Sequence, residues 1–367
     1  MRLSDRARAE LARGRADDPV IKVVDLAYVL FEKPDLAGTA RFLADFGLLP
    51  AGRVDTALYL RGYGGDAYCY VAQPGTTARF LGFALRAAAA ADLDRLAALP
   101  GASAVEAIEA PGGGRRVRLR APHGFEVHVV HGIASVAPTP LRPPLQVNFA
   151  ADKPRANAAQ RPPAGPAQVH RLGHVVMQAV HHGRTLSWLL RTFGFIVSDY
   201  QVLARAPEAG PVIAFLRCDL GATPADHHSV ALGAGFTDAF EHAAFEVQDL
   251  DAVALGGDHL RRRGWTHAWG IGRHILGSQL FDYWRDPDGQ MVEHYADGDR
   301  FDAATPTGRS DFGRDSLALW GPPLPKDFID TALSPRKVVQ LVSALARSED
   351  LTLRKLRAMA GAMAAGR

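Results

Sequence analysis

The alternation of apolar and polar positions in the second half of the chain predicts short strands grouped around two helices. The predicted strands lie near residues 172–178, 197–204, 211–218, 228–232, 242–247, 269–274, 278–285 and 290–295. Amphipathic spacing predicts helices over 183–193 and 249–263, with Asp249 as N-cap and with Gly194 and Gly264 as the stops. The order strand, helix, three strands occurs twice, so this half contains two βαβββ units.

The first half of the chain contains three of the same features in the same order. The matching pairs are 38–48 with 183–195, 92–94 with 249–251, and 120–124 with 285–289. Three matches in register indicate a duplicated domain. We therefore predict an α+β fold of two tandem domains, each made of two βαβββ units that form a curved half-barrel. Such a half-barrel suits a metal ion and a flat ligand.

A proline-rich stretch separates the two halves. Residues 135–168 contain eight prolines, which fix φ and remove backbone donors, so this stretch is predicted to run extended. The predicted parts are an N-terminal domain over 20–133, a linker over 134–168, a C-terminal domain over 169–300 and a C-terminal extension over 301–367. Two amphipathic helices are predicted in the extension, over 334–347 and 350–363; they suit packing against protein, a lid or assembly, and less well a membrane surface.

Composition narrows the class of protein. The chain has 367 residues with 47% hydrophobic and 22% charged residues, which is typical of a globular protein. Its net charge of +3 comes from residues 334–367, which alone carry +5, so the domains lack the basic excess of a nucleic-acid-binding protein. Cys69 and Cys218 are the only cysteines, and no apolar run is long enough to span a membrane. The first fifteen residues lack the apolar core of a secretory signal, so a cytoplasmic protein is expected.

Three polar residues lie in otherwise apolar strands, where a purely structural sheet has little use for them. They are His174 in RLGHVVM, His242 in HAAFEV and Glu293 in QMVEHY. Each needs a hydrogen-bond partner or a cation if it is buried. Two imidazoles and one carboxylate form the facial ligand set of non-haem Fe(II) enzymes, which leaves the other metal positions open for substrate and O₂.

The first half provides an internal comparison. By the register of the repeated features, Ala27 takes the place of His174 and His128 that of Glu293, while no histidine lies between Phe80 and Ala91. We therefore expect metal-binding residues in the second half alone.

The motifs of the last third resemble those of type I extradiol ring-cleaving dioxygenases of the vicinal oxygen chelate superfamily. The resemblance rests on the run 242–251 (HAAFEVQDLD), Gly272-Arg-His274, Tyr283, Asp286-Pro-Asp-Gly289 and Glu293. It implies Fe(II), with Mn(II) as the less frequent ion, bound in the C-terminal domain by His174, His242 and Glu293. It also implies a metal-free N-terminal domain and a homo-oligomer.

The same resemblance implies three catalytic residues around the metal. His228 would be the acid/base histidine, with the neighbouring His227 as the alternative; His274 would hydrogen-bond the bound catecholate, and Tyr283 would be the active-site tyrosine. The substrate pocket is predicted to include Trp269, Ile275 and the segment around Trp320.

These expectations define a function and two alternatives. The chain is expected to be an enzyme that cleaves a substituted catechol beside its diol with O₂, in the degradation of aromatic compounds. Its partners would be this small-molecule substrate and O₂, with neither nucleic acid nor a membrane. The alternatives are a glyoxalase-like, metal-dependent isomerase or lyase, and a non-enzymatic protein that binds an aromatic antibiotic. The sequence leaves the ring substituent open.

Overall fold

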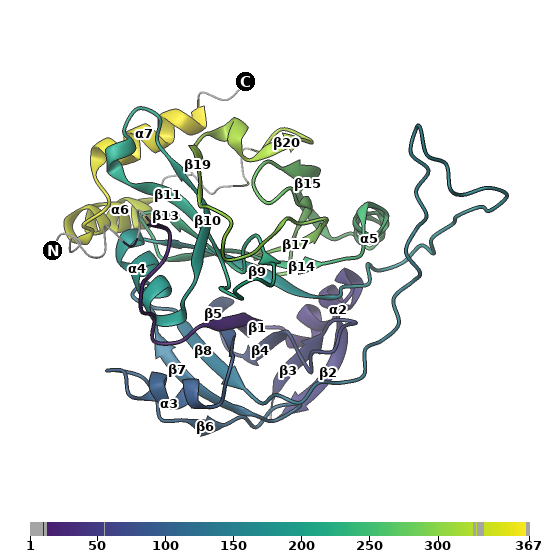
Figure 1. The fold of residues 1–367 in the computed structure, drawn as a ribbon, viewed down its shortest axis with the longest axis horizontal. Helices are drawn as coiled ribbons and strands as arrows, with labels where there is room; N and C mark the ends of the chain where they lie inside the picture. The colour runs from purple at the N-terminus through teal and green to yellow at the C-terminus, as the bar shows by residue number, and fades with distance from the viewer. Residues whose placement is uncertain (1–9, 11–12, 55, 326–327, 329–333, 365–367) are drawn as a thin grey trace.

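The computed structural model of the protein describes residues 10, 13–54, 56–325, 328 and 334–364. Two strongly curved sheets, one from each half of the chain, lie back to back along their central strands (Figure 1). The prediction that the chain has no secretory signal rests on its first fifteen residues, and most of these lie outside the described residues.

The N-terminal domain contains an eight-stranded sheet and two helices. Its strands are β1 (Val23–Lys33), β2 (Leu49–Val54), β3 (Ala57–Arg61), β4 (Tyr70–Pro74), β5 (Arg79–Ala87), β6 (Glu106–Ala107), β7 (Arg115–Arg120) and β8 (Glu126–His131), and its helices are α2 (Leu36–Phe46) and α3 (Ala91–Ala97). The strands are ordered β2-β3-β4-β1-β5-β8-β7-β6.

The C-terminal domain has the same plan with additional edge strands. Its strands are β9 (Arg171–Ala179), β10 (Ile196–Val202), β11 (Pro211–Arg217), β13 (Val230–Ala234), β14 (Ala239–Glu246), β15 (Thr266–His274), β16 (Leu280–Arg285) and β17 (Met291–Ala296), and its helices are α4 (His182–Phe193) and α5 (Leu250–Arg262). The order β10-β11-β13-β9-β14-β17-β16-β15 matches that of the first sheet strand for strand. This confirms the predicted α+β fold of duplicated βαβββ units.

The helix ends follow the sequence signals. The side chain of Asp249 accepts a hydrogen bond from the backbone N–H of Ala252 and caps α5. Gly194 ends α4 with a φ of 68°, a left-handed conformation that glycine adopts without a Cβ penalty.

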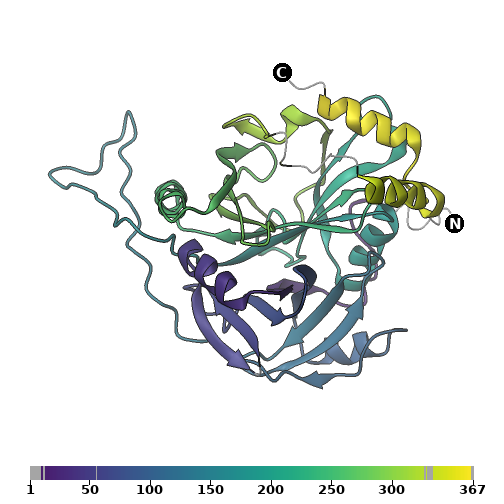
Figure 2. The same cartoon turned by 180° about the vertical axis from the view of Figure 1, so that it is seen from behind.

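The two domains are joined by buried polar contacts as well as by apolar packing. Lys33, at the end of β1, is fully buried and pairs with Asp286 and Asp288 in the turn before β17. The C-terminal end of α2 lies beside α5 in both views (Figures 1 and 2), where Asp45 accepts a hydrogen bond from the indole of Trp265 at 2.9 Å. These contacts pair polar groups of one domain with polar groups of the other. They therefore fix the position of the second sheet relative to the first.

The connection between the domains, residues 132–170, contains neither helix nor strand and projects from the body as a long loop (Figure 1). The extension after residue 300 instead packs onto the C-terminal domain. Its strands β19 (Gly308–Asp311) and β20 (Ala318–Trp320) pair with β10 and β15, and its helices α6 (Pro335–Arg347) and α7 (Leu353–Ala364) follow. Within the described residues, no helix combines the length and the apolar character that crossing a bilayer requires.

Candidate metal centre and active site

The pairing of three central strands brings the candidate ligands together. His174 on β9 lies opposite Ala244 on β14, and Ala244 lies opposite Glu293 on β17. Residues opposite each other share a face of the sheet, and His242, two residues before Ala244, shares that face too. The central position of this row is alanine, so the methyl group leaves the space between the three polar side chains free.

The three side chains form a small triangle of possible ligand atoms. Nε2 of His174 lies 3.2 Å and Nε2 of His242 lies 3.3 Å from Oε2 of Glu293, and the two nitrogens are 3.4 Å apart. Ligand atoms bound at right angles to a divalent ion, each at about 2.1 Å, lie about 3.0 Å from one another. The observed spacing therefore matches three adjacent ligands of one ion.

Burial strengthens the case for a metal ion at this triangle. His174 and Glu293 are buried, and neither carboxylate oxygen of Glu293 has a hydrogen-bond partner of good geometry among the described residues. Burial would raise the pKa of Glu293, but the imidazoles of His174, His242 and His274 hold it well below its usual value. Burial lowers the pKa of His174, which favours the neutral ring that binds metals. The donor set thus fits a divalent cation.

His274 and Tyr283 form a hydrogen-bonded pair beside the triangle. Tyr283 lies opposite Glu293 on β16, and its hydroxyl is 2.9 Å from Nε2 of His274. Nδ1 of His274 is 2.7 Å from the carbonyl oxygen of Leu317, to which it must donate. In the neutral ring Nε2 is then an acceptor for the Tyr283 hydroxyl. Burial raises the pKa of Tyr283 well above its usual value, so the phenol stays a proton donor.

His228, rather than His227, faces the triangle. The His228 ring lies 4.1 Å from the His174 ring, centroid to centroid, and lines the same cavity. His227 points away and places its Nε2 2.8 Å from Oδ2 of Asp199. Of the two alternatives left open by the sequence, the geometry favours His228 as the residue that meets a substrate.

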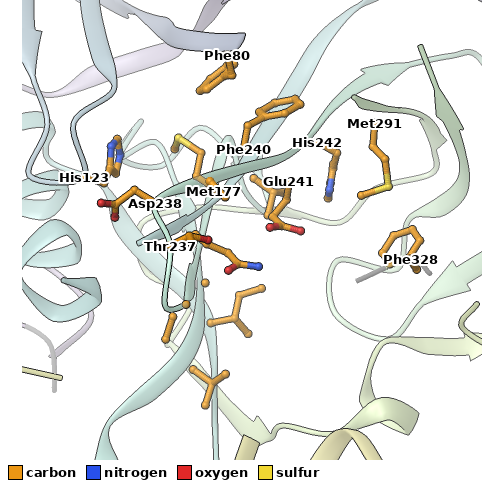
Figure 3. A pocket seen from close by; sticks show the side chains of 18 of the residues that line it. Phe80, His123, Met177, Thr237, Asp238, Phe240, Glu241, His242, Met291 and Phe328 are labelled. Carbon is orange, nitrogen blue, oxygen red and sulfur yellow. The ribbon is translucent and has the colours of Figure 1, made fainter. Parts of the chain in front are cut away.

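A cavity of about 1560 Å³ opens onto the triangle and takes its walls from both domains (Figure 3). Trp269 is one of its lining residues, as predicted, and its indole donates to the carbonyl of Pro322 at 2.9 Å. Ile275 does not line the cavity: it lies in the turn after β15, where its side chain is 43% exposed, and Leu276 takes its place in the wall. Trp320 itself is likewise on the surface, but the segment around it reaches the cavity through Leu317 and Leu324.

The C-terminal extension forms part of the cavity wall. Its contribution comes from the segment before α6 and from one face of α7, and the lining residues include Leu317, Leu324, Phe328, Leu356, Met359 and Met363. Phe328, labelled in Figure 3, is one of these residues; its ring also packs edge-on against that of Tyr283, with centroids 5.1 Å apart. The extension therefore supplies one side of the cavity that contains the candidate site.

Glu241 is a residue of the cavity that the sequence analysis did not single out. Between Phe240 and His242 the pairing of β14 with β9 shifts by one residue, so Glu241 is the extra residue of a β-bulge. The bulge turns its carboxyl group into the cavity next to His242 (Figure 3), where burial raises its pKa to about 7. Its one recorded polar partner is the side chain of Gln178, and it has no cationic partner within the described residues. Strict alternation along a strand cannot reveal such a bulge.

Comparisons with known proteins agree with the fold. Residues 171–294 match the model of the Glyoxalase/Bleomycin resistance protein/Dioxygenase superfamily. The chain is 31% identical to metapyrocatechase 2 of Cupriavidus necator over 330 residues, which cover 89% of this chain and 96% of that protein.

Two solved structures share the fold at 22% identity and a TM-score of 0.70. They are the homoprotocatechuate 2,3-dioxygenase of Arthrobacter globiformis, with 86% of this chain and 93% of that chain covered, and a Mn(II)-bound glyoxalase of Novosphingobium aromaticivorans, with 86% and 96% covered. The fold and the site define a member of the glyoxalase/dioxygenase superfamily. Within it, the chain belongs to the extradiol ring-cleaving dioxygenases.

Proposed function

We propose that the protein cleaves a substituted catechol beside its diol, with O₂, at a mononuclear Fe(II) centre held by His174, His242 and Glu293. The observation that carries this proposal is the buried triangle of two imidazole nitrogens and one carboxylate oxygen, 3.2 to 3.4 Å apart, at the base of a cavity. Such a set occupies one face of a metal ion and leaves the opposite face for ligands. Mn(II) is accepted by the same ligands, so the iron assignment is part of the proposal.

A bound divalent ion would lower the pKa of the catechol hydroxyls and let electrons pass from the ring to O₂. The residues around it would then orient the ring and move its protons. Trp269 and Phe328 are aromatic parts of the wall and suit the faces of a flat substrate.

His228 and Tyr283 have complementary roles in this proposal. Nε2 of His228 would take the proton of one substrate hydroxyl and return it later to the departing oxygen. The Tyr283 hydroxyl would donate to the substrate oxygen that stays ionised, because its raised pKa keeps the proton on the phenol. Because the phenol has one hydrogen, the Tyr283 hydroxyl would turn from Nε2 of His274 to the substrate oxygen when the substrate binds; before that, His274 holds it in place.

The experiment that tests the function is anaerobic reconstitution of the full chain with Fe(II), followed by oxygen-electrode measurements on a panel of catechols. We expect O₂ uptake in equal amounts with ring cleavage, and the yellow colour of a muconic semialdehyde-type product. Reconstitution with Mn(II) compares the two ions. A His174→Ala variant that still turns over at the wild-type rate would refute the ligand assignment, and turnover without O₂ would indicate an isomerase or lyase.

A further inference from the structure

The side chains of His228, His227 and Asp199 form a continuous hydrogen-bonded chain. It leads from the metal triangle, next to His228, to Asp199 on β10. Nδ1 of His228 lies 3.0 Å from Nδ1 of His227, and Nε2 of His227 lies 2.8 Å from Oδ2 of Asp199. His227 and His228 are 1% and 4% exposed, so water does not compete for these bonds. From the sequence the two histidines are alternatives for one role, whereas in the structure they are hydrogen-bonded partners.

Donor and acceptor rules fix the direction of this chain. The Asp199 carboxylate only accepts, so Nε2 of His227 carries the hydrogen and donates to it. In a neutral His227, Nδ1 is then an acceptor, and Nδ1 of His228 must donate to it. The neutral His228 ring has one hydrogen, so its Nε2 carries none and is left as a proton acceptor.

The surroundings hold Asp199 and His227 in this arrangement. The Ser198 hydroxyl donates to the carbonyl oxygen of His227 at 2.6 Å and itself accepts from Arg217 at 3.0 Å. Asp199 lies on β10 opposite Gly308 of β19, where a Cβ atom would be 1.9 Å from Oδ1 of Asp199. Glycine at position 308 thus leaves the space that the carboxylate occupies.

We propose that Asp199 and His227 are positioning residues that hold His228 in the tautomer whose Nε2 is free of a proton and faces the substrate. The inference rests on the proposed function of His228 as acid/base. On substrate binding, an O–H bond of the catechol breaks, its electron pair stays on oxygen, and the proton forms an N–H bond at Nε2 of His228. Asp199 stabilises the resulting imidazolium through His227.

The decisive variant is Asp199→Asn, because its amide reverses the chain. The Asn N–H₂ donates to Nε2 of His227, which then carries its hydrogen on Nδ1 and donates to His228; Nε2 of His228 becomes a donor and cannot take the substrate proton. Such a wrong-tautomer change lowers kcat by about 10⁴-fold in serine proteases. Here we expect kcat to fall at least about 100-fold with KM changed less than about threefold. Asp199→Ala removes the partner without reversing the chain and is expected to be less damaging.

A purely structural role for Asp199 predicts the opposite order, with Ala at least as damaging as Asn. The tautomer itself is read by NMR on metal-free protein with ¹⁵N-labelled histidine, in which the His228→Gln variant assigns the His228 signals. We expect the hydrogen on Nδ1 of His228 in the wild type and on Nε2 in Asp199→Asn. A hydrogen on Nε2 of His228 in the wild type would overturn the inference. Because this measurement needs no turnover, it stands even if the Fe(II)-loaded wild type cleaves no catechol, which would refute the proposed function alone.

Discussion

The two domains place different residues on equivalent rows of the same sheet. In the C-terminal domain the row is His174, Ala244 and Glu293; in the N-terminal domain, Tyr28 pairs with Ala84 and Ala84 with His128. The central alanine is the same in both. The outer residues differ.

In the N-terminal row each polar side chain has a hydrogen-bond partner, either in the row or beside it. Nε2 of His128 donates to Glu126 at 3.0 Å, so its Nδ1 accepts from the Tyr28 hydroxyl at 2.8 Å. Burial raises the pKa of Tyr28 to about 12, which keeps this donor protonated. In the C-terminal row the oxygens of Glu293 lack such partners. The comparison indicates that the N-terminal row satisfies its own polar groups, whereas the C-terminal row leaves possible ligand atoms free for a cation.

The largest difference in ring-cleavage rate is expected between two single variants, one in each domain, that change equivalent positions of the two rows. Glu293→Gln removes the anionic ligand and should lower ring cleavage at least about 1000-fold and abolish Fe(II) binding, because a neutral amide is a poor replacement for a carboxylate. His128→Gln, at the equivalent position, should leave the rate within about twofold. Oxygen uptake and metal content after gel filtration measure both. Equal losses in the two variants would contradict the assignment of the catalytic domain.

A second experiment asks whether the N-terminal row can be converted into a metal site. The triple variant Tyr28→His, Gly82→His, His128→Glu copies the C-terminal residues. A Cβ atom at Gly82, however, would lie 2.0 Å from the backbone carbonyl oxygen of Glu126. We expect the variant to bind one metal per chain, as we also expect of the wild type, and to lose about 3 kcal/mol of unfolding free energy.

The variant that keeps Gly82 but carries Tyr28→His and His128→Glu is the matched control for this experiment. It should lose less stability, because no backbone clash is introduced. Metal content by mass spectrometry and urea denaturation measure the outcome. Two ions per chain in the triple variant would show that backbone space does not limit the N-terminal row.

The helices and most strands could be predicted from the sequence because periodicity and caps are local signals, and the polar residues His174, His242 and Glu293 stood out against their apolar strands, which the structure brings together. Register is not local. The repeated sequence features make Ala27 the N-terminal equivalent of His174. Strand pairing shows that the equivalent is Tyr28. The cause is one extra residue in α4 relative to α2, which shifts any alignment based on the glycines that end these helices.

Other features of the site depended on contacts between distant segments. The carboxyl group of Glu241 reaches the cavity through a bulge, and Ile275 leaves it through a turn, although both lie next to predicted site residues. The hydrogen bond from His227 to Asp199 joins residues 28 positions apart. Alternation along one strand carries no information about any of these three.

Glu241 allows a test with a smaller expected effect, because the C-terminal domain has a carboxyl group at a bulge where the N-terminal domain has an apolar residue. The equivalent bulge in the N-terminal domain lies at Leu81, between the pairs formed by Phe80 and Gly82. A buried carboxylate in the wall disfavours an anionic ligand. In Glu241→Gln we expect the kcat/KM of a carboxylate-bearing catechol to rise about tenfold relative to that of unsubstituted catechol.

The effect should depend on pH, because the pKa of Glu241 is raised to about 7. Above this value the group is charged and the wild type should discriminate most strongly; below it the difference between wild type and Glu241→Gln should shrink. Asp238→Asn alters a second carboxyl group of the same cavity and is the control. An equal change of the kcat/KM ratio in Asp238→Asn would show that the total negative charge of the cavity, and not Glu241 in particular, disfavours the anionic substrate.

The smallest expected effect comes from removing one hydroxyl from each domain. Tyr28→Phe leaves Nδ1 of His128 without its donor and should cost about 1 kcal/mol of unfolding free energy, with ring cleavage within about twofold of wild type. Tyr283→Phe removes the hydroxyl beside His274 and should lower kcat while changing stability by a similar amount. Urea denaturation and steady-state kinetics on both variants separate the two roles. If Tyr28→Phe lowered kcat as much as Tyr283→Phe, the N-terminal row would contribute to catalysis, and the contrast between a self-satisfied row and a metal-binding row would be wrong.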